Sequence, residues 1–131
     1  MATEVRLATR RSALALYQAR RVAEWLRAVH DDITVELVEI DSTGDLDRTS
    51  PVAQLTQMGA FVRSVQAAVL DGRADAAVHS LKDLPTAGAD GLVLAAYPER
   101  AAPWDVLVGS TLGELPEGAV VGTGSPRRIA Q

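Results

Sequence analysis

A strand–helix–strand pattern near the start of the chain constrains the fold more than any other feature. Val5–Thr9 is a short, mostly apolar run, and Ile33–Ile40 alternates and is rich in β-branched residues. Between these runs, Ser12 is a good N-cap for a helix. The apolar residues after it recur every three or four positions: Ala15, Ala19, Val22, Leu26 and Val29. This βαβ unit predicts an α/β fold in which helices flank a mixed β-sheet.

The next part of the chain predicts a loop, a second helix and further strands. Asp41–Met58 shows no clear periodicity and is expected to be a long loop. A helix is expected over Gly59–Leu70, with Gly72 as its C′ residue. Short apolar runs bounded by turn residues then predict four strands: Ala76–Val78, Leu92–Ala96, Asp105–Gly109 and Ala119–Val121.

Composition excludes several classes of function. The net charge of −4 argues against a nucleic-acid binder, and no apolar run approaches the roughly 18 residues that span a bilayer. The chain has no cysteine and its two histidines, His30 and His79, lie far apart, so we expect no metal site. With no secretory signal, a cytoplasmic protein that binds a small anionic ligand is expected.

The polar residues directly after the Ala76–Val78 run form the first candidate site. Within Ala74–Pro85 the run is followed by His79, Ser80, Lys82 and Asp83, and Lys82 is the only lysine of the chain. Open α/β sheets place ligands at the carboxyl ends of their strands, so Asp83 is a candidate for proton transfer and Lys82 for anion binding. The alternatives are a salt-linked surface turn and, for His79, a histidine packed at the end of a strand.

Two other strand-to-helix junctions carry arginines. Gly122–Arg128 follows an expected strand and opens an expected helix, with Pro126 in its first turn. Thr9–Ser12 has the same character. Backbone N–H groups and guanidinium groups at such junctions bind carboxylates or phosphates. A glycine turn or a capped helix start with solvated arginines remains the alternative for each.

Together, three stretches of the chain resemble the porphobilinogen deaminase (hydroxymethylbilane synthase) family: Leu7–Ala15, Ala74–Pro85 and Val121–Arg128. That family belongs to tetrapyrrole (haem) biosynthesis and condenses four porphobilinogen molecules, with loss of ammonia, on a dipyrromethane primer. The resemblance implies a first domain of periplasmic-binding-protein-like fold at residues 1–99. Residues 100–131 would then be a hinge and the truncated start of a second domain.

The resemblance also implies roles for individual residues. Asp83 would be the catalytic acid/base carboxylate. Thr123 and Ser125 would contact the primer. The residues that would bind the acetate and propionate groups of substrate and primer are Arg10, Ser12, Ser80, Lys82, Arg127 and Arg128.

Several features depart from the family pattern. Members are substantially longer, and the cysteine that holds their primer is absent here. Gln54–Gly59 replaces a Gly- and Lys-rich segment, Ser64 stands where an acidic residue is common, and Gly124 stands where serine is common. The chain also ends inside an expected helix.

We therefore expect the N-terminal piece of a deaminase that is inactive alone. A stand-alone binding or regulatory module for pyrrole carboxylates, or a small enzyme that uses Asp83 on another substrate, are the alternatives. An open sheet edge favours association. Either residues 118–124 fold back to cover it, or a second copy or a missing C-terminal partner completes the sheet.

Overall fold

The computed structural model describes residues 3–41 and 51–131 of the chain. The chain divides into two units, Met1–Pro98 and Glu99–Gln131. The roles that the resemblance gives to residues 1–99 and 100–131, a first domain and the start of a second, stay predictions.

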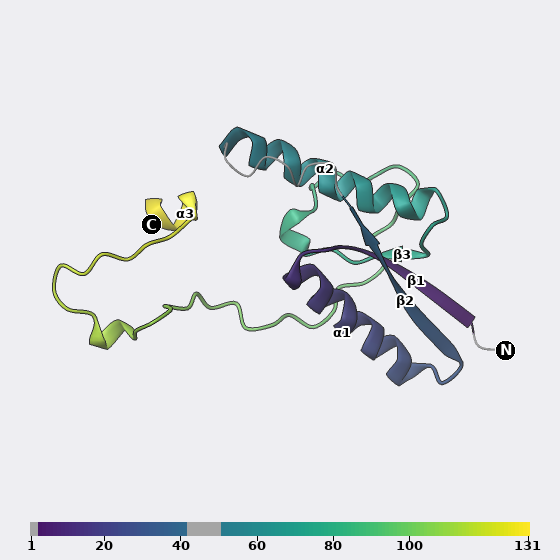
Figure 1. Ribbon diagram of the computed structural model, residues 1–131, viewed down its shortest axis with the longest axis horizontal. Helices are drawn as coiled ribbons and strands as arrows, with labels where there is room; N and C mark the ends of the chain where they lie inside the picture. Colours follow the sequence, from purple (N-terminus) through teal and green to yellow (C-terminus); the bar gives the residue numbers. More distant parts are fainter. Residues whose placement is uncertain (1–2, 42–50) are drawn as a thin grey trace. The chain divides into compact units, whose positions relative to one another are not determined.

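The first unit is built on three parallel strands (Figure 1). They are β1 (Thr3–Arg10), β2 (Ile33–Ile40) and β3 (Ala76–Ala77), in the order β2-β1-β3. Thr3 pairs with Ile33 and Arg10 with Ile40, while Ala8 pairs with Ala77. The predicted α/β class is confirmed, but all strand pairs among the described residues are parallel, so the sheet is not mixed there.

Two helices connect these strands. α1 (Ala13–Val29) begins at the predicted cap, because the Ser12 Oγ accepts a hydrogen bond from the Ala15 N–H at 3.3 Å. The predicted apolar face is correct except at its end, where Val29 is 75% exposed because the helix stops there.

No helix among the described residues is long and apolar enough to cross a membrane.

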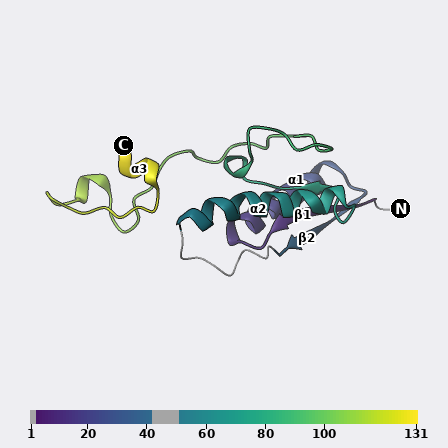
Figure 2. The same ribbon diagram turned by 90° about the horizontal axis from the view of Figure 1, so that it is seen from above.

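α2 (Pro51–Leu70) starts eight residues before the predicted Gly59. The loop predicted over Asp41–Met58 is therefore wrong from Pro51 onward, and residues 42–50 lie outside the described part. Proline suits the first turn of a helix, and apolar residues at 52, 55 and 58 continue the helical spacing that the prediction missed. α2 runs along β1, which it contacts (Figure 2).

The core lies on both faces of the sheet. Leu7 packs with Val35 and with Ala23 of α1, whereas its neighbour Ala8 packs with Val65 and Ala68 of α2. Successive residues of a strand point to opposite faces, so α1 and α2 cover different faces. Alanines on both helices let each helix lie close to the strands.

The end of α2 is fixed by a backbone motif. Gly72 has a φ of +72°, its N–H donates to the Val69 carbonyl at 3.1 Å, and the Arg73 N–H donates to the Ala68 carbonyl at 2.9 Å. These two bonds form a Schellman motif, which confirms Gly72 as the C′ residue.

The remaining chain is mostly irregular. Leu92–Ala96, Asp105–Gly109 and Ala119–Val121, all predicted as strands, form none in the structure. These apolar runs lack a neighbouring strand among the described residues, and Val93, Val108 and Val120 are 88–96% exposed. The second unit contains a 3₁₀ turn, η2 (Leu112–Glu114), and a short helix, α3 (Pro126–Ala130). Residues 118–124 form no strand, so the cover of a sheet edge stays a prediction.

Candidate functional site

A pocket of about 180 Å³ opens where β1 and β3 end. Its position follows from the topology: the chain moves from β1 to β2 on one side, then crosses back through α2 to β3 on the other side of β1. Ligands of open α/β sheets bind where the strand order reverses in this way. The polar residues that line the pocket are Arg10, Ser12, His79, Ser80, Lys82 and Asp83, and the apolar ones are Leu14, Ala15, Val62 and Val78.

Local backbone structure carries these side chains to the pocket. Arg10 is the last residue of β1 and Ser12 is the cap of α1. After β3, the Val78 N–H donates to the Ala8 carbonyl at 2.9 Å, and one 3₁₀ turn, η1 (Leu81–Asp83), then turns the chain. Five of the predicted site residues therefore line one pocket in the first unit: Arg10, Ser12, Ser80, Lys82 and Asp83.

The Asp83 carboxylate lies beside the Arg10 guanidinium. The distance from Arg10 Nη1 to Asp83 Oδ2 is 3.8 Å, and the two side chains are 30% and 15% exposed, respectively. This distance is an ion pair without a hydrogen bond. The guanidinium carbon of Arg10 also lies 4.2 Å from the centre of the Phe61 ring, a cation–π arrangement that orients the cation.

Ser80 has a partner that the sequence analysis missed. Its hydroxyl donates to the Gln18 Oε1 of α1 at 2.6 Å, which links the loop after β3 to the first helix. Gln18 lies three residues after Ala15 and four before Val22, so it stands on the apolar face of the helix. A polar side chain on an apolar helix face needs a hydrogen-bond partner, and this was the sequence signal for such a contact.

His79 is the most unusual group in the pocket. Its ring is partly buried, and its buried Nε2 atom has no hydrogen-bond partner among the described residues. Burial lowers the pKa of His79 below its ordinary value, Asp83 acts in the opposite direction, and Arg10 lowers the pKa further. These surroundings favour the neutral form of the imidazole.

The two neighbouring arginines at the end of β1 have different surroundings. Arg11 pairs with Glu39 at 3.4 Å and with Asp41 at 2.5 Å, so acidic groups at the end of β2 already neutralise it. Lys82 is exposed at the pocket and makes no ion pair with another residue of the described chain. Arg10 and Lys82 are therefore the cations that the pocket offers to a ligand.

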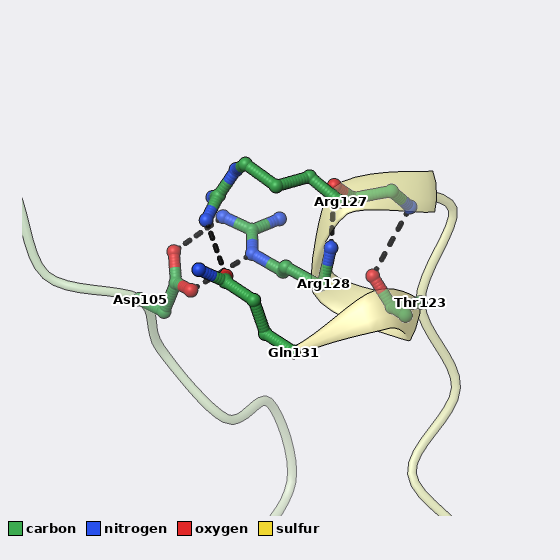
Figure 3. A network of polar contacts seen from close by, with 6 residues as sticks. Asp105, Thr123, Arg127, Arg128 and Gln131 are labelled. Carbon is green, nitrogen blue, oxygen red and sulfur yellow. Dashed lines mark hydrogen bonds and ion pairs between the residues drawn. The ribbon is translucent and has the colours of Figure 1, made fainter.

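The other predicted site residues gather at α3 in the second unit (Figure 3). Arg128 forms a two-pronged ion pair with Asp105, through Nε at 2.9 Å and through Nη2, and Arg127 Nη1 donates to the Gln131 Oε1 at 2.6 Å. The Arg128 hydrogen bonds hold the pKa of the Asp105 carboxyl below its usual range.

Thr123 and Ser125 shape the start of α3. The Thr123 Oγ1 accepts a hydrogen bond from the Ser125 N–H at 3.2 Å, and the Ser125 Oγ accepts one from the Arg128 N–H at 3.3 Å. All four predicted residues, Thr123, Ser125, Arg127 and Arg128, thus lie at this one helix start.

A metal centre has no basis in the described residues, which contain no group of three His, Asp or Glu side chains that could hold an ion. The polar groups of the pocket fit an organic anion instead. Its two cations and two serine hydroxyl groups can bind ligand carboxylates, and the Asp83 carboxylate can accept a hydrogen bond from a pyrrole N–H. A dipyrromethane carries these groups, so the residues present suit it. The chain contains no cysteine that could attach it.

Comparisons with known proteins agree with this chemistry. Residues 5–131 match the family model described as "Porphobilinogen deaminase, dipyromethane cofactor binding domain". The chain is 52% identical over 132 aligned positions to the porphobilinogen deaminase of Thermobifida fusca, an alignment that covers 98% of the chain and 41% of the relative.

Two further relatives give the same result. The porphobilinogen deaminase of Acidothermus cellulolyticus is 51% identical over 97% of the chain and 39% of its own length. The probable porphobilinogen deaminase of Pyrobaculum islandicum is 48% identical over 95% of the chain and 42% of its own length. The chain thus spans about two-fifths of the length of these relatives, and it belongs to the porphobilinogen deaminase family.

Proposed function

We propose that this chain is the substrate- and primer-binding part of a hydroxymethylbilane synthase, a transferase that condenses four porphobilinogen molecules with loss of ammonia. The observation that carries the proposal is the Asp83 carboxylate, held 3.8 Å from Arg10 in a pocket that also contains Lys82 and two hydroxyl groups. Porphobilinogen carries two carboxylates on a pyrrole ring. A site for it needs cations for the carboxylates and an acceptor for the ring N–H.

Asp83 is assigned the chemical role. Each condensation breaks the bond between the aminomethyl carbon and its nitrogen, releases ammonia, and joins that carbon to a ring carbon of the next pyrrole, which loses a proton. Positive charge develops on the ring as ammonia leaves, and a carboxylate stabilises that charge. Asp83 is 15% exposed, so water screens this interaction less than it would on an open surface.

The other pocket residues are assigned to binding. Arg10 and Lys82, with the hydroxyl groups of Ser12 and Ser80, bind the acetate and propionate groups. Arg10 is already oriented by the Phe61 ring, which reduces the entropy lost when it takes a ligand carboxylate.

The residues of the second unit are assigned to the primer. Thr123 and Ser125 contact the dipyrromethane, and Arg127 and Arg128 bind its carboxylates. When bound, the dipyrromethane supplies the end to which new pyrrole units are joined. Because this chain has no cysteine, the attachment point has to come from another polypeptide segment.

The chain is further proposed to work in the cytoplasm with a covering partner. The exposed apolar runs support the covering partner: Val93, Val106 and Val120 are 83–96% exposed. A C-terminal part of the enzyme, or a second copy of the chain, completes the sheet and covers these runs. A monomer in sedimentation analysis, both alone and mixed with the C-terminal part, would rule out both arrangements.

A second candidate function is a binding or regulatory module for pyrrole carboxylates. It is favoured by one observation: the five pocket residues all lie in the first unit of this chain. A small enzyme that uses Asp83 on another substrate is the remaining alternative.

The test is turnover in a reconstituted enzyme. The chain is mixed with a separately made C-terminal part of the Thermobifida fusca relative, and loss of porphobilinogen and release of ammonia are followed. We expect turnover in the mixture and none with the chain alone. Asp83→Asn lowers the rate at least about 100-fold, as expected when an acid/base group is removed. Asp31→Asn, in an exposed turn, leaves it unchanged.

Three outcomes decide between the candidates. An active Asp83→Asn mixture contradicts the role of Asp83. Binding of porphobilinogen without turnover in the mixture favours the binding module. Turnover by the chain alone, lost in Asp83→Asn, favours the small cysteine-free enzyme.

A further inference from the structure

His79 is a group of this pocket to which the proposed function assigns no role. Its Nε2 atom is buried and makes no hydrogen bond within the described residues, although the ring lines the same pocket as Arg10 and Asp83. A buried polar atom without a partner destabilises the folded chain, so such atoms are rare and mark strain or function. The free chain tolerates this cost in a residue that lines its candidate ligand pocket.

We propose that His79 is a further ligand-binding residue, a neutral imidazole whose Nε2–H donates a hydrogen bond to a carboxylate of the bound pyrrole. The inference rests on the proposed function, because it takes a carboxylate-bearing pyrrole as the ligand. It adds an uncharged donor to a site that already contains the cations Arg10 and Lys82.

Arg10 and His79 line the same pocket, so a ligand carboxylate that pairs with Arg10 lies near the His79 ring. Arg10 pairs with Asp83 at 3.8 Å, beyond hydrogen-bond distance, so little holds its guanidinium against the carboxylate. The Arg10 guanidinium therefore takes a ligand carboxylate without giving up a hydrogen bond to Asp83. The ligand then satisfies a donor that the free chain leaves unpaired.

The electrostatic surroundings explain why a neutral donor suits this place. Burial lowers the pKa of His79 and the nearby Arg10 lowers it further, against the opposing effect of Asp83. A cationic side chain at this position would repel Arg10 and would attract the Asp83 carboxylate, which has to remain available to the substrate. A neutral imidazole donates to the ligand without either effect.

The experiment compares His79→Phe with the wild-type chain. Phenylalanine keeps a planar ring and removes both nitrogen atoms. The affinity for porphobilinogen is measured by NMR titration, and thermal unfolding is measured on the free chains. His30→Phe is the matched control, because His30 is an exposed residue that caps the end of α1.

We expect two opposite effects in His79→Phe. The affinity falls at least about tenfold, which is the loss of one hydrogen bond to a charged group. The melting temperature stays equal or rises, because the unpaired buried nitrogen is gone. A purely structural histidine would instead lower both the affinity and the melting temperature, and that result overturns the inference.

A second measurement needs no variant. The chain has only two histidines, so ¹⁵N-labelled histidine gives two sets of ring signals. Porphobilinogen is expected to shift the Nε2 signal of His79 and leave His30 unchanged. An unchanged His79 signal in a chain that binds porphobilinogen overturns this inference alone. A wild-type chain that binds no porphobilinogen overturns the proposed function and the inference with it.

Discussion

Val65→Ala tests whether the packing of α2 on the sheet supports the pocket. Val65 is 1% exposed and packs with Ala8 and Ala68, and the same helix supplies Phe61 and Val62 to the site. Losing two buried methyl groups removes about 1.6 kcal/mol of burial, at about 0.8 kcal/mol for each group. The remaining cavity adds about 1 kcal/mol, and the better helix propensity of alanine returns about 0.6 kcal/mol. The expected loss in the free energy of unfolding is about 2 kcal/mol.

The measurement is urea unfolding followed by circular dichroism, with the slope held to the wild-type value. Val29→Ala is the matched control, because it makes the same substitution at a helix residue that is 75% exposed. Its stability is expected to stay within about 0.5 kcal/mol of wild type. Equal effects of the two substitutions would refute the claim that α2 is anchored through Val65.

Two further predictions concern the ends of the strands and helices. Arg6 binds both oxygens of Asp75 and lowers the pKa of that carboxyl, chiefly through a side-chain hydrogen bond. The wild-type chain is therefore expected to melt at a higher temperature than Arg6→Gln above about pH 4. This difference is lost as the pH falls through the lowered pKa, and a pH-independent difference would contradict this. Gly72→Ala is expected to lower the free energy of unfolding, measured in urea, by about 1–2 kcal/mol, because the φ of Gly72 is +72°. Gly88→Ala is the control and is expected to stay near wild type, because a Cβ at Gly88 meets no atom within 4 Å.

The parts of the fold that sequence could predict are those with local signals. The βαβ unit follows from the alternation of Ile33–Ile40 and the helical period after Ser12, and both elements form where expected. Gly72 ends α2 because the C′ position needs a positive φ. Each of these choices depends on residues that are neighbours along the chain.

The later strands could not be predicted in this way. A short apolar run becomes a strand only beside another strand, which supplies partners for its backbone N–H and C=O groups. Val106 and Val120 have the composition of strand residues, yet both are more than 80% exposed and unpaired in the described part of the chain. Composition alone carries no information about that partner.

The candidate site shows the same division. Ala74–Pro85 identified His79, Ser80, Lys82 and Asp83 because all four follow one short apolar run, which forms β3 in the structure. Sequence could not distinguish Arg10 from Arg11, since their difference depends on Glu39 and Asp41, which are brought near by the parallel pairing of β1 and β2.

A map of where porphobilinogen binds tests most directly whether the pocket is the substrate site. Backbone ¹⁵N–¹H spectra of the chain are recorded during a titration with porphobilinogen. We expect the largest shifts at the pocket residues, Arg10, Ser12, Ser80, Lys82 and Asp83, and we expect Asp83→Asn to change this pattern. Shifts confined to residues away from this pocket, with those five unaffected, would contradict the claim that it is the substrate site.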